Sequence, residues 1–269
     1  MITLDWKERL IQDCHDFFER KIPQDDYDFD IIYNAYPQRK DNKIPIDVIT
    51  LVATTLASKM IKRHRDFVPF CDYIWKNKGL NGKIVFVCII NKFLKKDFSF
   101  YFEYVQKYLF QLSDPNEINL LLDKIFLPIF KKQPLENIDT MVFWLQKNNE
   151  KINPSVSKII IRIGKTDKNF FVKFTEKLEK KWSEANPDFA KICGYFLKQL
   201  SKVDYNRYLD FYKNYQSSRD PIIVEILTLA LVQYDDFIYQ AYENWGKSGN
   251  ARLKKTAIAG LKFLKKRKP

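Results

Sequence analysis

A recurring pair of residues, aspartate or asparagine followed by proline, limits the folds open to this chain more than any other feature. The pairs start 39, 33 and 34 residues apart, at Asp114-Pro115, Asn153-Pro154, Asn186-Pro187 and Asp220-Pro221. An Asx side chain at a helix N-cap accepts an otherwise unpaired backbone N–H, and proline suits the next position because it has no N–H to leave unpaired. An apolar run on helical spacing follows each pair, so each pair predicts the start of a helix.

The same step along the chain predicts further helices. Asn81-Gly82 and Asn250 precede two more runs of this kind. Aromatic-rich runs on helical spacing lie between them and begin near Asp66, Asp97, Leu135, Asn169, Asp204 and Asp235. Helix pairs that recur at this interval are typical of HEAT-like repeats. We therefore predict an all-α fold, an α–α superhelix (solenoid) of HEAT or armadillo type, with an irregular helical bundle as the alternative.

Residues 1–63 fall outside the repeat. They contain an amphipathic N-terminal run, a polar stretch from Pro23 to Pro45, and the apolar run IDVITLVATTLASKMIKRH. We expect these residues to form an N-terminal cap on the first of about six helix pairs in residues 64–269. No low-complexity linker divides the chain, so we predict a single domain over residues 1–269.

The chain is strongly basic, with 46 Lys and Arg against 33 Asp and Glu and a net charge of +13. Such an excess attracts polyanions. An AT-rich genome also raises lysine content throughout a protein, so the placement of the charge must decide between binding and mere composition. The low counts of 7 glycines and 11 prolines favour long helices over a strand-rich fold.

Corresponding positions in successive repeats predict a basic row. The fourth residue after each Asx-Pro proline is in turn Asn119, Lys158, Lys191 and Glu225, and the last repeat supplies Lys254 and Lys255. Lys158, Arg162 and Lys165 also share one helix face. A basic row along a concave surface suits a phosphate backbone, whereas the alternative is a solvated outer face.

The aromatic residues mostly follow helical spacing, which predicts core packing. Trp144, Tyr195 and Trp245 are exceptions, because each is expected near a helix end or beside the basic row. Aromatic rings in such places can stack on a base or a sugar. The sequence therefore adds Trp144 and Tyr195 to the predicted nucleic-acid contacts.

The usual metal and nucleophile patterns are absent from the sequence. Cys14, Cys71, Cys88 and Cys193 lie far apart and form no C-x-x-C pair, so neither zinc nor disulfides are indicated and buried thiols are expected. The two histidines lack metal-ligand spacing, and no Gly-rich phosphate loop occurs. We predict no metal and no cofactor.

The N-terminal run contains acidic residues, and no stretch of about 18 apolar residues follows it or occurs elsewhere. Neither a secretion signal nor a membrane-spanning helix is predicted. Together with the unpaired cysteines, this favours a cytoplasmic protein.

Several segments resemble one known family. They are DFVPFCDYIWKNKGLNGKIVFVCIINKFLKK, SDPNEINLLLDKIFLPIFKK, FWLQKNNEKINPSVSKIIIRIGK and FAKICGYFLKQL. In order and spacing they are similar to the repeats of the bacterial AlkD-type alkylpurine DNA glycosylases, the DNA alkylation repair family of HEAT-like repeat proteins. The similarity covers most of residues 46–265. It implies a concave cleft for duplex DNA in which a carboxylate stabilises the sugar cation and aromatic residues bracket an alkylated base.

The resemblance departs from the family at its catalytic position. The family's aspartate falls on Asn119, which carries no charge, while its arginine falls on Lys158 and its tryptophan on Tyr195. Glu117 is the better substitute carboxylate, with Asp114 the other choice. The alternative for Glu117 is a first-turn glutamate that stabilises the helix dipole.

Two functions follow as hypotheses. The first is a HEAT-like protein that binds duplex DNA, with excision of alkylated bases left open. The second is a non-enzymatic scaffold that binds an acidic protein. Carboxylates that pair with the basic row would remove the main physical support for DNA binding.

Overall fold

The computed structural model describes residues 6–21, 32–33, 43–147 and 149–268. Every regular element in these ranges is a helix and none is a β-strand, which confirms the all-α prediction. Most of the polar stretch from Pro23 to Pro45 lies outside the described residues. The chain divides into two compact units, Met1–Leu112 and Ser113–Pro269. The single domain over residues 1–269 stays a prediction.

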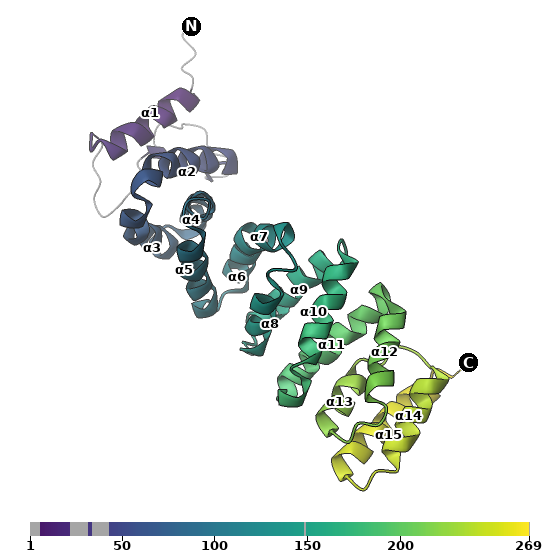
Figure 1. Cartoon of the computed structure of the whole chain (residues 1–269). Coiled ribbons are helices and arrows are strands. Elements are labelled where there is room, and N and C mark those ends of the chain that lie inside the picture. Colours follow the sequence, from purple (N-terminus) through teal and green to yellow (C-terminus); the bar gives the residue numbers. More distant parts are fainter. Residues whose placement is uncertain (1–5, 22–31, 34–42, 148, 269) are drawn as a thin grey trace. The chain divides into compact units, whose positions relative to one another are not determined.

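Unit 1 is built around α4. Its elements are α1 (Trp6–Phe18), α2 (Ile46–Met60), the 3-10 helix η3 (Ile61–Phe67), α3 (Val68–Asn77), α4 (Gly79–Phe93) and α5 (Phe98–Gln111). Helix α4 packs against α2 and α3, and α1 packs against α2 (Figure 1). Burial of the apolar faces of these helices provides the core, for example at Leu56, Phe86 and Ile90, which are fully buried.

The corner between α3 and α4 corrects one predicted helix start. Helix α4 begins at Gly79, two residues before the predicted cap at Asn81. Gly79 has a φ of +54°, a left-handed conformation that favours glycine and turns the chain. A Cβ at Gly82 would lie 2.2 Å from the carbonyl oxygen of Ile74, so Gly82 permits close packing inside the helix and does not start it.

Three side chains join α3 to α5 in unit 1. The Tyr104 hydroxyl donates to Asp72 Oδ1 at 2.6 Å, and the Tyr108 hydroxyl donates to the same oxygen. Burial is the main reason that the pKa values of both tyrosines lie above the ordinary value of 10. Both hydroxyls therefore stay protonated and hold the two helices together through one carboxylate.

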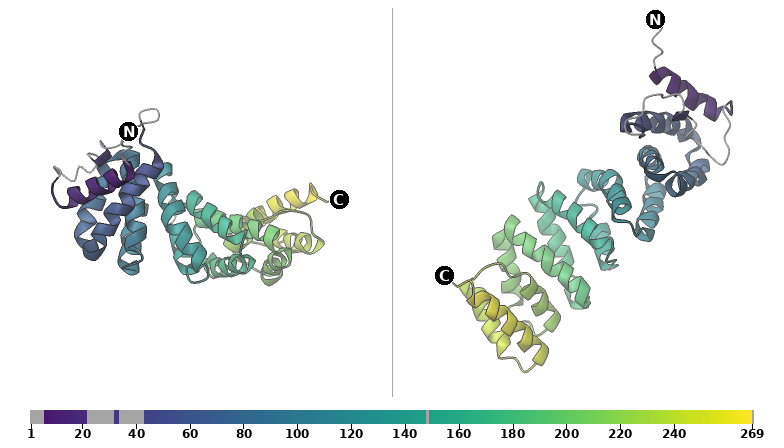
Figure 2. Two further views of the ribbon diagram at one scale, coloured as in Figure 1. Left: turned by 90° about the horizontal axis from the view of Figure 1, so that it is seen from above. Right: turned by 180° about the vertical axis from the view of Figure 1, so that it is seen from behind.

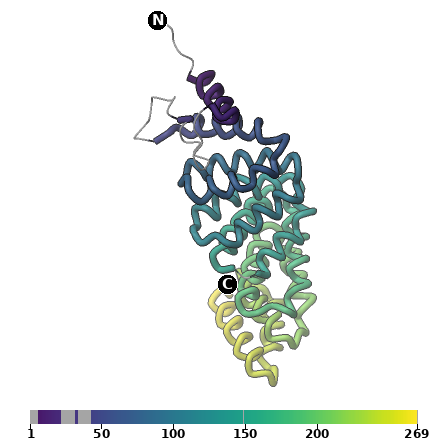
Figure 3. The backbone as a smooth tube through the Cα atoms, turned by 90° about the vertical axis from the view of Figure 1, so that its left-hand side faces the viewer, coloured from purple at the N-terminus to yellow at the C-terminus, as the bar shows by residue number. Residues whose placement is uncertain are grey.

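Unit 2 is a succession of helices that lie beside one another in chain order (Figure 1, Figure 2 and Figure 3). They are α6 (Pro115–Leu121), the π-helix η4 (Leu122–Phe126), α7 (Leu127–Lys132), α8 (Ile138–Gln146), α9 (Asn153–Gly164), α10 (Lys168–Glu179), η5 (Trp182–Glu184), α11 (Pro187–Val203), α12 (Tyr205–Tyr215), α13 (Pro221–Leu229), α14 (Asp236–Gly246) and α15 (Ala251–Lys265). Helix α11 packs against α13 and α13 against α15, while α10, α12 and α14 pack beside them.

Most of the predicted caps in unit 2 are confirmed. The side chains of Asp114, Asn186, Asp220 and Asn250 each accept a backbone N–H in the first turn of α6, α11, α13 and α15. For example, Asn186 Oδ1 accepts from the Phe189 N–H at 2.8 Å. Local sequence therefore determines where these four helices begin.

The prediction for Asn153 as an N-cap is wrong. The N–H of Asn153 already donates to the Asn149 carbonyl at 2.9 Å, so a turn precedes it and Ile152 is the cap residue. Asn153 is 7% exposed, and among the described residues its Oδ1 has no hydrogen-bond donor. The helix therefore starts at Asn153, one residue before the predicted start at Pro154.

Aromatic side chains fill the core of unit 2, as predicted for most of them. The Tyr212 hydroxyl donates to the Leu227 carbonyl at 2.8 Å, and the Tyr208 hydroxyl reaches the Ala230 carbonyl at 3.2 Å. These bonds connect α12 to α13. They satisfy polar atoms that burial would otherwise leave unpaired.

The cysteines are free thiols, and Cys14, Cys71 and Cys193 are buried as predicted, while Cys88 is half-buried. Burial raises the pKa of Cys14 and of Cys193 to about 12, which keeps both thiols protonated and unreactive at neutral pH. Among the described residues, no group of three His, Cys, Asp or Glu side chains is arranged to hold a metal. No helix in those ranges is long and apolar enough to cross a bilayer.

Candidate functional site

An open groove between α9 and α11 brings together three of the residues that the sequence predicted. Its volume is about 510 Å³, and it is lined by Lys158, Lys191 and Tyr195 together with Glu150, Asn153, Pro154, Ser157, Asp188 and Ile192. Tyr195 is 43% exposed, so its ring is available to a ligand. The helical spacing that suggested a common row therefore identified real neighbours here.

The groove carries charge of both signs. Lys191 Nζ lies 2.8 Å from Asp188 Oδ1, and this hydrogen bond is the main reason that the pKa of Lys191 is above 10.5. Glu150 adds a second carboxylate beside the two lysines. The groove is therefore a mixed site and not a purely basic one.

The next predicted cation is also paired. Arg162 on α9 forms an ion pair with Asp123 on η4. Lys165, at the end of α9, is exposed and lines a separate groove of about 420 Å³ with Lys168 and Lys202. Arg162 consequently bridges two helices and brings a carboxylate onto the predicted basic row.

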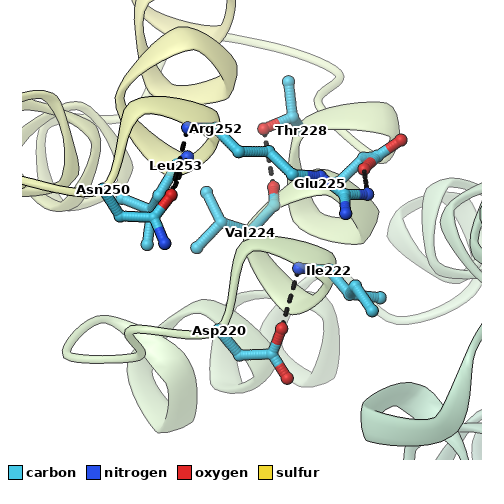
Figure 4. A network of polar contacts seen from close by, with 8 residues as sticks. All are labelled: Asp220, Ile222, Val224, Glu225, Thr228, Asn250, Arg252 and Leu253. Carbon is cyan, nitrogen blue, oxygen red and sulfur yellow. Dashed lines mark hydrogen bonds and ion pairs between the residues drawn. The ribbon is translucent and has the colours of Figure 1, made fainter.

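A second ion pair between neighbouring helices lies in the last helices of unit 2. Arg252 on α15 lies 2.8 Å from Glu225 on α13, as Figure 4 shows beside the Asp220 and Asn250 caps. Lys254 and Lys255 are both exposed. Successive helical residues project ~100° apart, so only Lys255, four residues after Ala251, corresponds to Lys158 and Lys191.

These side chains define what we call the ladder face of unit 2. It comprises the residues four and eight positions after each helix-opening proline, or after Ala251 on α15, together with their ion-pair partners. Its members are Asn119, Asp123, Lys158, Arg162, Asp188, Lys191, Tyr195, Glu225, Leu229, Arg252, Lys255 and Ala259. Each cross-helix ion pair joins neighbouring helices of this face, so the face follows the order in which the helices pack.

Sequence reasoning missed Leu229, which is 42% exposed. It follows Pro221 by the same eight residues by which Tyr195 follows Pro187, so the repeat spacing could have found it. A Cβ at Gly194 would lie 2.6 Å from the Leu229 Cβ, which shows how closely α11 and α13 approach beside Tyr195. Tyr195 on α11 and Leu229 on α13 are therefore exposed apolar side chains on two helices that approach each other closely.

Trp144 and Trp245 lie in the last turns of α8 and α14, near helix ends as expected, but both are buried. Trp144 is 0% exposed and packs against the rings of Phe126 and Phe130 at centroid distances of 4.8 and 5.3 Å. Trp245 is 4% exposed. Core packing therefore places both indoles where they cannot stack on a base, which corrects the predicted contact at Trp144.

The two positions proposed for catalysis lie on α6. Asn119 and Glu117 are both half-buried, and Glu117 stands in the first turn of the helix. Two residues along a helix project ~200° apart, so they do not share a face. Glu117 holds the position that buried Val156 and Phe189 occupy in α9 and α11. A first-turn glutamate that favours the helix dipole accounts for this placement.

No family model matches this chain, and no curated protein and no solved structure is significantly similar to it. The resemblance to the DNA alkylation repair family stays a prediction.

Proposed function

We propose that residues 113–269 form a HEAT-like solenoid whose ladder face binds an acidic, partly apolar segment of another protein. The observation that carries the proposal is that Tyr195 on α11 and Leu229 on α13 are both exposed, with Lys158 and Lys191 lining the groove beside Tyr195. Support for the solenoid comes from the packing order of α11, α13 and α15 and from their Asx caps.

The ladder face offers both parts of an amphipathic recognition site. Tyr195 and Leu229 supply an apolar centre that loses contact with water when a partner covers it. Lys158, Lys191 and Lys198 are exposed on α9 and α11 beside that centre. A segment with one or two large apolar side chains and flanking carboxylates matches this distribution.

The carboxylates of the ladder face disfavour duplex DNA. Asp123, Asp188 and Glu225 each lie beside a cation of the face. A phosphate backbone gains affinity when cations release its condensed counterions, and cations that already have protein carboxylates beside them contribute less. A rigid duplex presents phosphates to these carboxylates along the whole face, whereas the few carboxylates of a short peptide can lie beside Lys158, for which no ion pair is found among the described residues.

Base excision forms no part of the proposal. Asn119 has no charge with which to stabilise a sugar cation, and Glu117 projects away from it on the helix. Binding of a partner without catalysis requires only the residues of the ladder face.

Duplex DNA is the second candidate, and one observation favours it. Lys158 and Tyr195 line the same groove, and they are the positions on which the family's arginine and tryptophan fall. Lysine retains the charge of arginine but lacks its bidentate fork.

The test is a selection of peptides from a displayed random library on the full chain, followed by affinity measurements on the selected peptides. We expect acidic peptides that contain a large apolar residue. Leu229→Ala should weaken their binding by about tenfold, because it removes apolar contact area without a change of charge. Leu80→Ala is the matched control, since Leu80 is also exposed, at 67%, and belongs to α4 of unit 1, outside the ladder face.

A parallel measurement uses a fluorescent duplex at two salt concentrations, with wild type and a Lys158→Glu, Arg162→Glu, Lys191→Glu variant. Tight, salt-sensitive DNA binding that this variant loses and Leu229→Ala retains would establish the second candidate and overturn the first. Selected peptides without acidic residues, or affinities unchanged by Leu229→Ala, would also contradict the proposal.

A further inference from the structure

A third pocket of unit 2 lies between the loop that joins α12 to α13 and the loop that joins α14 to α15, and none of its lining residues belongs to the ladder face. Its volume is about 570 Å³. The side chains important here are Ser218, Arg219, Trp245, Lys247 and Ser248. No part of the function proposed above uses this pocket.

The pocket is lined by cations and by no described carboxylate, whereas the ladder face carries charge of both signs. Arg219 and Lys247 are both exposed, one from each loop. Among the described residues neither cation has a carboxylate within salt-bridge distance. No aspartate or glutamate lines the pocket. The two loops therefore present uncompensated positive charge to the same volume.

The serines provide hydroxyl donors at the same place. Ser218 Oγ accepts the Asp220 N–H, and Ser248 Oγ accepts the Asn250 N–H, each at 3.2 Å. A hydroxyl that accepts in this way keeps its own hydrogen for donation. Each loop thus contains the same kind of Ser-x-Asx turn. Each serine can direct its hydroxyl hydrogen at an anion.

Trp245 supplies an independent sign of a missing acceptor. It lines the pocket, it is 4% exposed, and its indole Nε1 has no hydrogen-bond acceptor within the described part of the chain. A buried donor without a partner costs stability, and native structures seldom leave one. A ligand oxygen would provide that acceptor only by displacing the side chains that cover Nε1, because this atom has almost no accessible surface.

We propose that this pocket binds a phosphomonoester group. Arg219 can take two phosphate oxygens through its planar fork, Lys247 adds a point charge, and the hydroxyls of Ser218 and Ser248 donate to the remaining oxygens. The volume exceeds that of a phosphate ion, so the pocket has room for part of a molecule that carries the group. A phosphorylated side chain and a nucleoside monophosphate are the two sources that share this chemistry.

The experiment follows the indole N–H resonances of the ¹⁵N-labelled full chain by NMR, with the Trp245 signal assigned by its absence in Trp245→Phe. We expect the Trp245 signal to shift on titration with a phosphoserine peptide or with a nucleoside monophosphate. The source that binds more tightly is the physiological class. The unphosphorylated peptide and the nucleoside should leave the signal unchanged.

Two variants make the test specific. Arg219→Ala with Lys247→Ala should weaken binding at least about tenfold, because two charge-assisted contacts are lost. Gly249→Glu should also weaken it, because a side chain there meets open space and places a carboxylate at the pocket. The control, Lys265→Ala with Lys266→Ala, removes the same charge from exposed residues at the other end of α15. A Trp245 signal that never moves, or equal binding by the double variant and the control, would overturn the proposal.

Discussion

The start of α4 in unit 1 and the start of α11 in unit 2 are specified in different ways. Helix α11 begins where Asn186 accepts a backbone N–H of its own first turn. Helix α4 begins at Gly79 and continues through Gly82, whose missing side chain lets it approach the backbone of α3. A cap depends on residues a few positions away, whereas a close approach depends on a neighbouring helix. Local patterns therefore predict the first kind of start and miss the second.

The largest expected effect on the free energy of unfolding comes from a substitution at the corner between α3 and α4. Gly82→Ala places a Cβ against the backbone oxygen of Ile74, which cannot move away as a flexible side chain can. We expect a loss of about 3 kcal/mol in the free energy of unfolding. Urea unfolding measures it, with Gly249→Ala as a control that should change little because its Cβ meets no atom within 4 Å. Equal effects would show that the corner tolerates the extra methyl group.

Removal of the side-chain link between α3 and α5 should have the next largest effect on the free energy of unfolding. Asp72→Ala leaves the hydroxyls of Tyr104 and Tyr108 without their acceptor. We expect unit 1 to lose about 2 kcal/mol of unfolding free energy. The triple variant with both tyrosines replaced by phenylalanine should recover part of the loss. If it is less stable than Asp72→Ala alone, unpaired hydroxyls are not the cause.

Two copies of one motif allow a direct test of capping in unit 2. Asn186→Ala should cost about 1 kcal/mol because the Phe189 N–H loses its acceptor. Asn153→Ala should cost less than about 0.5 kcal/mol, since its side chain caps no N–H. Thermal or urea unfolding of both variants measures the two losses of unfolding free energy. Equal losses would mean that the two asparagines act alike.

The smallest expected effects are on the pKa values of two N-cap aspartates and on the stability that these residues contribute at low pH. The pKa of Asp97 lies below 3.8 mainly through the Arg65 side chain, and that of Asp204 mainly through the backbone N–H of Arg207. A lowered pKa adds stability above pH 3.8 that is lost as pH falls through the folded-state value. Arg65→Ala should therefore raise the pKa of Asp97 more than Lys168→Ala raises that of Asp204. A carboxyl ¹³C titration measures both, and equal shifts would refute the distinction.

Within the candidate site, prediction succeeded where spacing alone was enough. Lys158, Lys191 and Tyr195 share a groove because residues at the same distance from each cap recur on helices that pack together. Prediction missed Leu229 because only polar and aromatic residues were considered as contacts. It failed at Trp144 because helical spacing does not state which side of a helix its neighbours cover.

The sequence by itself determined that the chain is helical, that it is basic, and where α6, α11, α13 and α15 begin. Each of these properties depends on composition or on atoms a few residues apart. Only the tertiary structure decided that Asp123 and Glu225 pair with Arg162 and Arg252 and that Arg219 and Lys247 share a pocket. Those contacts join residues 27 to 39 positions apart for the ion pairs, and their energies depend on which helices pack side by side.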